Sequence, residues 1–171
     1  HIAEFAGTAR FKTFVKQNVR HKGQLIEIVR LVKTWNRVSG NLFNGYYLEI
    51  LVTDVLSHHE IISYSRALRH IFYAFFSKVA FQVHDPANIE FQVEGLNDIE
   101  EIVEAMNLVK RSYHLANKAA VFERDGEIDK ALDCWSKLFH HVFPTRVDMI
   151  VGKARRDGIK GADALRMLIG E

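Results

Sequence analysis

A lysine and a tyrosine on neighbouring predicted helices have the types and spacing that could bind a nucleotide. Lys33 lies among apolar residues on a helix expected over 24–38, and a lysine held on a packed helix is a good point-charge donor to a triphosphate. Tyr46 opens the next expected helix directly after Gly45, where backbone amides can face an anion and an aromatic ring can stack on a base. The spacing alone favours the simpler interpretation, a surface position for Lys33 and a core position for Tyr46.

The residue types and their spacing give little support for metal binding or nucleophilic catalysis. The nine histidines include the adjacent pairs His58-His59 and His140-His141, but neighbours on a helix point about 100° apart and do not chelate a metal readily. The sequence has no HExxH, CxxC, Walker A, GxSxG or GxGxxG motif. Cys134 has no histidine one helical turn away, so we expect a buried small hydrophobe rather than a nucleophile. The sequence therefore contains no complete catalytic set.

Composition indicates a globular helical protein with an uneven charge distribution. Of 171 residues, 48% are hydrophobic and 26% charged, and two prolines leave room for long helices. Residues 1–40 hold eight Lys and Arg against two acids, whereas residues 85–135 hold five against twelve. The basic third favours an anionic ligand, although complementarity between packed helices would explain the same charges. The single cysteine favours a reducing, cytoplasmic location, and no apolar run reaches the ~18 residues of a membrane span.

Apolar residues at helical spacing predict an all-α fold, a bundle of about five main helices with short terminal helices. Thr8 is expected to cap the first short helix, and Asn97 with Glu100 to form the capping box of the longest one. Residues 89–94 alternate apolar and polar, and we expect an extended connector without a strand partner. The main helices are expected over 24–38, 46–57, 60–79 (with Leu68, Phe72 and Phe76 on its core stripe), 98–124 and 127–140, and the short ones over 9–18, 147–155 and 161–169.

Several stretches resemble the helical half of template-independent nucleotidyltransferases. This superfamily includes oligoadenylate synthetases, cyclic GMP-AMP synthase and the bacterial cyclic-oligonucleotide synthases (CD-NTases) of anti-phage defence. Segments 30–36 and 46–52 resemble its R-L-x-K-x-W-N helix and the aromatic plus L-E-x-L that follow. Downstream the sequence is similar to the SMODS-type branch, and the resemblance covers residues 24–144. The downstream matches are Asp85-Pro86-Ala87-Asn88, Ala116-Asn117-Lys118-Ala119-Ala120, Gly126-Glu127-Ile128, Lys130-Ala131-Leu132, Trp135, Lys137-Leu138-Phe139 and Phe143-Pro144.

The resemblance implies roles for individual residues. Lys33 would contact the donor triphosphate, and Tyr46 would stack on the nucleotide base. Gly45 stands where many members have a serine that contacts phosphate, so a backbone amide or Asn44 would substitute for the hydroxyl. Glu49 is expected to have a structural role. The implied layout is a nucleotide-clamping lobe over residues 1–144, with short C-terminal helices packed on it over 145–171.

The family's chemistry also needs a mixed-sheet lobe that this sequence lacks. In that lobe a G-S motif and three aspartates hold two Mg²⁺ ions, which activate the attacking hydroxyl and neutralise the leaving pyrophosphate. No G-S followed by D-x-D occurs here, and the chain begins with His1, so we expect the catalytic lobe to precede it. The resemblance therefore implies an antiviral nucleotidyltransferase lobe that is inactive alone. Its expected partners are ATP or GTP with Mg²⁺, its own N-terminal lobe and a regulatory protein.

Two other functions stay open. The chain could be a stand-alone helical interaction module whose acidic region, residues 98–133, docks a basic partner protein. It could also be an RNA-binding lobe that uses its basic first forty residues, as in related tRNA-extending and double-stranded-RNA-sensing enzymes. Because the chain has no extended basic run interleaved with aromatic residues, the sequence does not favour nucleic acid, and it does not indicate a membrane partner.

Overall fold

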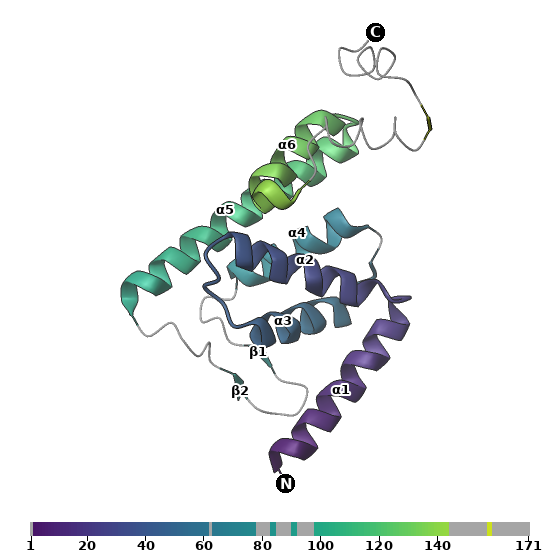
Figure 1. Cartoon of the computed structure of the whole chain (residues 1–171), viewed down its shortest axis with the longest axis vertical. Coiled ribbons are helices and arrows are strands. Elements are labelled where there is room, and N and C mark those ends of the chain that lie inside the picture. The colour runs from purple at the N-terminus through teal and green to yellow at the C-terminus, as the bar shows by residue number, and fades with distance from the viewer. Residues whose placement is uncertain are drawn as a thin grey trace.

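The protein is an all-α bundle (Figure 1). The structure, a computed structural model, describes residues 2–61, 63–77, 83–84, 90–91, 98–143 and 157–158. Within these residues two short strands, β1 and β2, pair antiparallel with Val83 opposite Phe91. No helix in these ranges combines the length and apolarity needed to cross a bilayer. The elements are α1 (Ile2–Arg20), α2 (Gln24–Val38), α3 (Gly45–Ser57), α4 (Tyr64–Ser77), β1 (Val83–His84), β2 (Glu90–Phe91), α5 (Ile99–Arg124), α6 (Ile128–Phe139) and the 3₁₀ turn η1 (His140–Val142).

The helices are arranged around α2, α3 and α4. These three pack against one another, and α5 packs against α4 and carries α6 along its C-terminal half (Figure 1). On the other side α1 runs beside α2 and α3, and its N-terminal end diverges from them (Figure 1). The amphipathic pattern explains this order, because each helix must bury its apolar stripe against a neighbour.

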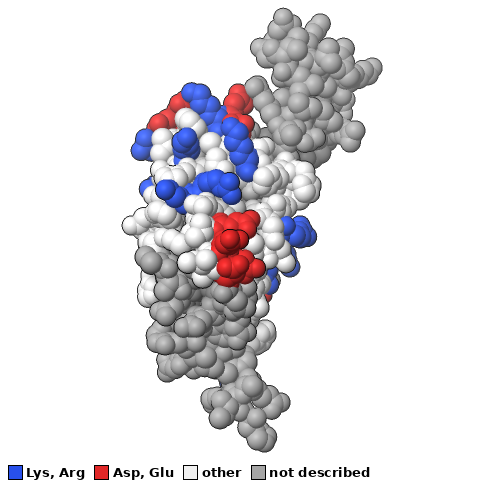
Figure 2. All heavy atoms as spheres, turned by 90° about the vertical axis from the view of Figure 1, so that its left-hand side faces the viewer, with Lys and Arg blue, Asp and Glu red and all other residues white. Residues whose placement is uncertain are grey.

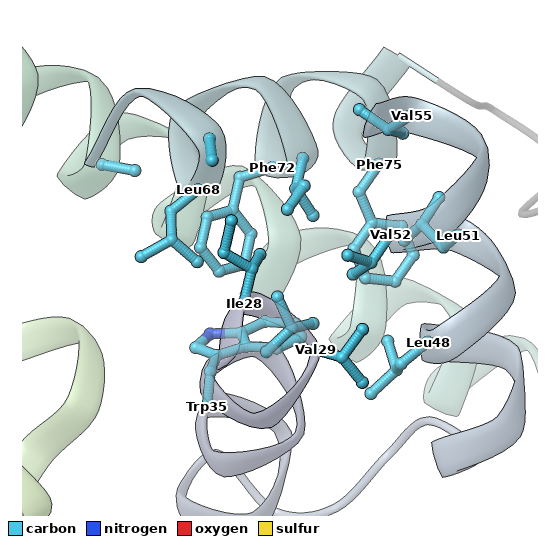
Figure 3. Close-up of a cluster of buried hydrophobic side chains, with 14 of the residues drawn as sticks. Ile28, Val29, Trp35, Leu48, Leu51, Val52, Val55, Leu68, Phe72 and Phe75 are labelled. Carbon is cyan, nitrogen blue, oxygen red and sulfur yellow. The ribbon is translucent and has the colours of Figure 1, made fainter. Parts of the chain in front are cut away.

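The centre of the core is the indole ring of Trp35 on α2. Figure 3 shows this fully buried ring among side chains of α2, α3 and α4. Its centroid lies 4.9 Å from that of Phe72 in an edge-on arrangement and 5.9 Å from that of Phe43 in a stacked one. The indole Nε1 donates a hydrogen bond of 2.9 Å to the Ser112 hydroxyl on α5. Trp35 therefore connects the central three helices to α5 through both packing and a buried hydrogen bond.

The loop between α2 and α3 is held by Asn36, a buried residue near the end of α2. Its Nδ2 donates to the carbonyl of Phe43 at 2.7 Å, and its Oδ1 accepts from the amide of Phe43 at 3.0 Å. A third bond of 3.1 Å runs from Nδ2 to Oδ1 of Asn41. Gly40 and Asn41 have φ angles of 104° and 57°, left-handed values that glycine and asparagine adopt most easily. Asn36 thus fixes the path by which the chain turns from α2 into α3.

The helix boundaries agree with the prediction where glycine or asparagine adjoins a helix. They differ from it at the starts of α1 and α4. The predicted range 24–38 is confirmed for α2, and α3 begins one residue before the predicted Tyr46. The prediction that Thr8 caps the first helix is wrong, because α1 already begins at Ile2 and runs to Arg20. The predicted start of α4 at residue 60 is also wrong. The helix begins at Tyr64 because the Ser63 hydroxyl accepts from the amide of Arg66 at 3.3 Å.

The remaining predictions concern residues from Phe76 onward. The N-cap of α5 is Asp98, whose carboxylate accepts from the amide of Glu100 at 3.3 Å, and Asn97 lies outside the described residues. The extended segment was expected to have no strand partner, and this is wrong because its residues Glu90–Phe91 pair with the chain just upstream. Phe76, expected in the core, is 43% exposed and stacks on Tyr113 at 5.6 Å. The short helices expected near 147–155 and 161–169 fall outside the described residues.

Candidate functional site

Three helices enclose a cleft of about 510 Å³, between α1 on one side and α2 with α3 on the other. This volume lies within the range of pockets that bind small ligands. Most of the lining is apolar, and the charged groups Arg30, Lys33 and Glu49 come from the two central helices. The lining residues are Phe11, Thr13 and Phe14 of α1, Ile26, Val29, Arg30 and Lys33 of α2, and Tyr46, Glu49, Ile50 and Thr53 of α3.

The ammonium group of Lys33 lies beside the N-terminus of α3. Its Cε and Nζ atoms are 3.6 and 3.8 Å from the position that a Cβ on Gly45 would take. Nζ forms an ion pair with the Glu49 carboxylate, and each of these two side chains is about 40% exposed. An exposed pair of this kind contributes little to stability, at most about 1 kcal/mol. The Lys33 ammonium is therefore accessible from the cleft, and its ion pair with Glu49 on the neighbouring helix orients it.

Tyr46 forms part of the cleft wall next to this lysine. The side chain is partly buried against the core, and its hydroxyl oxygen is shielded from solvent. Its backbone amide donates to Oδ1 of Asn44 at 2.8 Å, which makes Asn44 the N-cap of α3. The first turn of α3 contains no acidic residue. The partial positive charge of this helix N-terminus is thus not offset by an acid of that turn.

The residues singled out from the sequence meet at one place, with different tasks. Lys33 and Tyr46 both line the cleft, and Gly45, which is not a lining residue, lies beside the Lys33 side chain. Asn44, the expected substitute for a phosphate-binding serine, uses its side-chain oxygen to cap α3. Glu49, expected to be structural, pairs with Lys33.

The site also contains residues that the sequence reasoning missed. Arg30 precedes Lys33 by three positions, a spacing that places both cations on one side of α2, so helical periodicity could have found it. Phe11 and Phe14 come from a helix that is distant from α3 in the sequence, and no local pattern would have placed them at the cleft.

In the described part of the chain, the cleft lining contains no metal-ligand cluster and no cysteine. No three His, Cys, Asp or Glu side chains gather there in a way that could hold a metal ion. Cys134 is buried on α6, as predicted, and burial together with Asp133 raises the pKa of its thiol. A thiol of raised pKa is mostly protonated near neutral pH, which is the unreactive form.

The acidic region proposed as a docking surface is broken up by basic residues. Figure 2 views the side on which α5 begins and shows acidic side chains in one patch, with Lys and Arg over the neighbouring surface. On α6 and its approach, acids are paired locally: Asp125 accepts from Arg124 at 2.9 Å, and Asp133 pairs with Lys137 at 2.7 Å. Residues 98–133 thus do not present a surface of one sign, and docking of a basic partner stays a prediction.

Comparison with known proteins adds one relative. The chain is similar to a probable cyclic nucleotide synthase of Bacillus cereus, with 22% identity over 132 residues. The alignment covers 77% of this chain and 40% of the relative, so the chain spans well under half of the length of the protein it matches. No protein-family model and no solved structure matches the chain. The similarity supports a relationship to cyclic nucleotide synthases.

Proposed function

We propose that the chain is the helical nucleotide-binding lobe of a cyclic-oligonucleotide synthase of the SMODS type. In this role Lys33 binds the donor triphosphate, and the ring of Tyr46 contacts the base. The aspartates that bind Mg²⁺ would be supplied by a catalytic lobe outside this chain, and anti-phage signalling in the cytoplasm would be the biological setting.

The observation that carries this proposal is that Lys33 and Tyr46 line one cleft, with Gly45 beside the Lys33 side chain. A triphosphate needs cations and amide donors, whereas a base needs a flat apolar surface. Here two cations on α2 and the N-terminus of α3 lie next to an aromatic side chain. The relative named as a cyclic nucleotide synthase matches most of this chain, which supports the same class of ligand.

The Glu49 carboxylate would compete with a phosphate for the ammonium group of Lys33. In the structure this carboxylate forms an ion pair with the ammonium of Lys33. A polyphosphate carries more negative charge than one carboxylate and can form several charge-assisted hydrogen bonds. Binding would therefore exchange the Lys33–Glu49 pair for a Lys33–phosphate contact, with Arg30 as the second cation at the cleft.

The direct test is calorimetric titration of the chain with ATP and GTP, using a charge-matched pair of variants. We expect Lys33→Gln to weaken ATP binding about tenfold, because a hydrogen bond to a charged group contributes about 1.5 kcal/mol or more. Lys110→Gln removes the same charge from an exposed position on α5 away from the cleft, and it should leave the affinity unchanged. Equal affinities for Lys33→Gln and wild type, or no binding of either nucleotide by the wild-type chain, would refute the proposal.

A second prediction concerns the glycine that replaces the family's serine. A Cβ at Gly45 would have only ordinary van der Waals contacts with Lys33, and Gly45 does not have a positive φ angle. Gly45→Ser should therefore fold normally and strengthen ATP binding several-fold, since its hydroxyl can donate a hydrogen bond of about 1 kcal/mol to phosphate. Gly45→Ala is the control, because it adds the Cβ without the hydroxyl. If alanine and serine change the affinity equally, the hydroxyl does not reach the ligand.

A further inference from the structure

The α1 side of the cleft carries two aromatic side chains to which the proposed function gives no role. Phe11 and Phe14 are three residues apart and so lie on the same side of the helix. Phe14 packs partly against the core, whereas Phe11 is 68% exposed although it lines the cleft. Pockets that bind small ligands are lined mainly by hydrophobic and aromatic side chains, and Phe11 is such a side chain.

The two walls of the cleft have complementary chemistry. The wall formed by α2 and α3 contains Tyr46 and the two cations, and the wall formed by α1 contains the two phenylalanines and Thr13. A nucleobase has two π-faces, and Tyr46 can cover one of them. A cleft of about 510 Å³ has room for a nucleoside between its walls. Polyphosphate chemistry at one end and aromatic surfaces on both sides are what a nucleotide needs, whereas a lipid or an apolar peptide would leave Arg30 and Lys33 unused.

We propose that Phe11 is a second base-contacting residue, which stacks on the face of the base turned away from Tyr46. Nucleotide binding then bridges α1 to α3, and Phe14, which packs partly against the core, forms the adjoining part of the α1 wall. This inference rests on the proposed function, because it assigns a second wall to the same binding site.

Another explanation for the exposure of Phe11 lies on the same helix. Val15 and Val19 are 41% and 73% exposed and continue from Phe11 at one-turn spacing, so the three could form a stripe that docks a partner protein. Only Phe11 of these three lines the cleft. Val19 is therefore a matched control: it is as exposed as Phe11 and lies on the same stripe, but it is away from the site.

The experiment compares Phe11→Ser, Phe11→Trp and Val19→Ser in the full chain, with ATP and inorganic triphosphate as separate probes in calorimetry. We expect Phe11→Ser to lose about tenfold or more in ATP affinity, because the variant lacks the aromatic ring on which the base would stack. Triphosphate affinity should be unchanged in that variant, Phe11→Trp should retain ATP binding, and Val19→Ser should match wild type for both probes.

The outcomes separate this inference from the proposed function. If Phe11→Ser binds ATP as wild type does while Lys33→Gln is impaired, Phe11 does not contact the base and the proposed function stands. If Phe11→Ser loses ATP and triphosphate equally, the residue shapes the cleft as a whole, and the stacking role is wrong. If Val19→Ser loses as much ATP binding as Phe11→Ser, the stripe acts as one surface, and the inference is overturned. If the wild-type chain binds neither probe, both proposals fail.

Discussion

Replacing Trp35 with alanine is expected to lower the free energy of unfolding by about 3–5 kcal/mol, the range for removing a large buried aromatic side chain. The ring is fully buried, and its centroid lies within 4.9–6.1 Å of those of Phe43, Phe72 and Phe75. A cavity at this position would disturb three helices at once, because α2, α3 and α4 all pack around it (Figure 3). Chemical denaturation followed by circular dichroism measures the loss.

The hydrogen bond from Trp35 to Ser112 can be separated from the packing of the ring. Ser112→Ala removes the acceptor and leaves the indole Nε1 buried without it, at a cost of about 1–3 kcal/mol. Trp35→Ala should therefore be the more damaging change. If Ser112→Ala destabilises the protein as much as Trp35→Ala, the contribution of aromatic packing is smaller than the geometry indicates.

Asn36→Ala is expected to destabilise the protein by about 3 kcal/mol and also to weaken nucleotide binding. The amide and the carbonyl of Phe43, a buried residue, would both lose their hydrogen bond to Asn36, and each such bond contributes up to about 1.5 kcal/mol. The same bonds set where α3 begins relative to Lys33, so the Lys33 ammonium would no longer be held beside Gly45. Denaturation and ATP titration on one sample measure both effects.

Asn41→Gly is the matched control for Asn36. It removes only the 3.1 Å bond between the two asparagine side chains and retains both bonds to Phe43. Glycine also accepts the φ angle of 57° without strain, so the free energy of unfolding should change by less than about 1 kcal/mol. A loss in Asn41→Gly equal to that in Asn36→Ala would mean that the side-chain pair, and not the Phe43 bonds, holds the loop.

Local signals were sufficient to predict the helices next to the candidate site. Gly23 and the Ser39-Gly40-Asn41 stop bound α2 on both sides, and Asn44 supplies a side-chain cap that starts α3. Where several residues could act as a cap, the sequence alone did not decide between them. The hydroxyl of Ser63 starts α4 later than expected, and Thr8 does not start α1.

The candidate site was predictable only in the part contributed by α2 and α3. Lys33 and Tyr46 are separated by one short loop, so their convergence could be anticipated from the sequence. The ion pair between Lys33 and Glu49 depends on how two helices rotate relative to each other, which periodicity does not give. The wall formed by Phe11 and Phe14 depends on tertiary packing of a third helix. The roles of Lys33, Gly45, Asn44 and Tyr46 in binding stay predictions.

The attachment of α1 determines how the mouth of the cleft can change its width. Bonds near its C-terminal end fix the helix: His21 Nε2 donates to the carbonyl of Leu56 at 2.9 Å, and the Arg20 guanidinium donates to that of Ser57. At 1.5 Å rise per residue, Phe14 lies about 10 Å and Phe11 about 15 Å from this anchor along the helix axis. A tilt of α1 about its anchor would displace Phe11 about 1.5 times as far as Phe14. It would therefore widen or narrow the entrance of the cleft more than its floor.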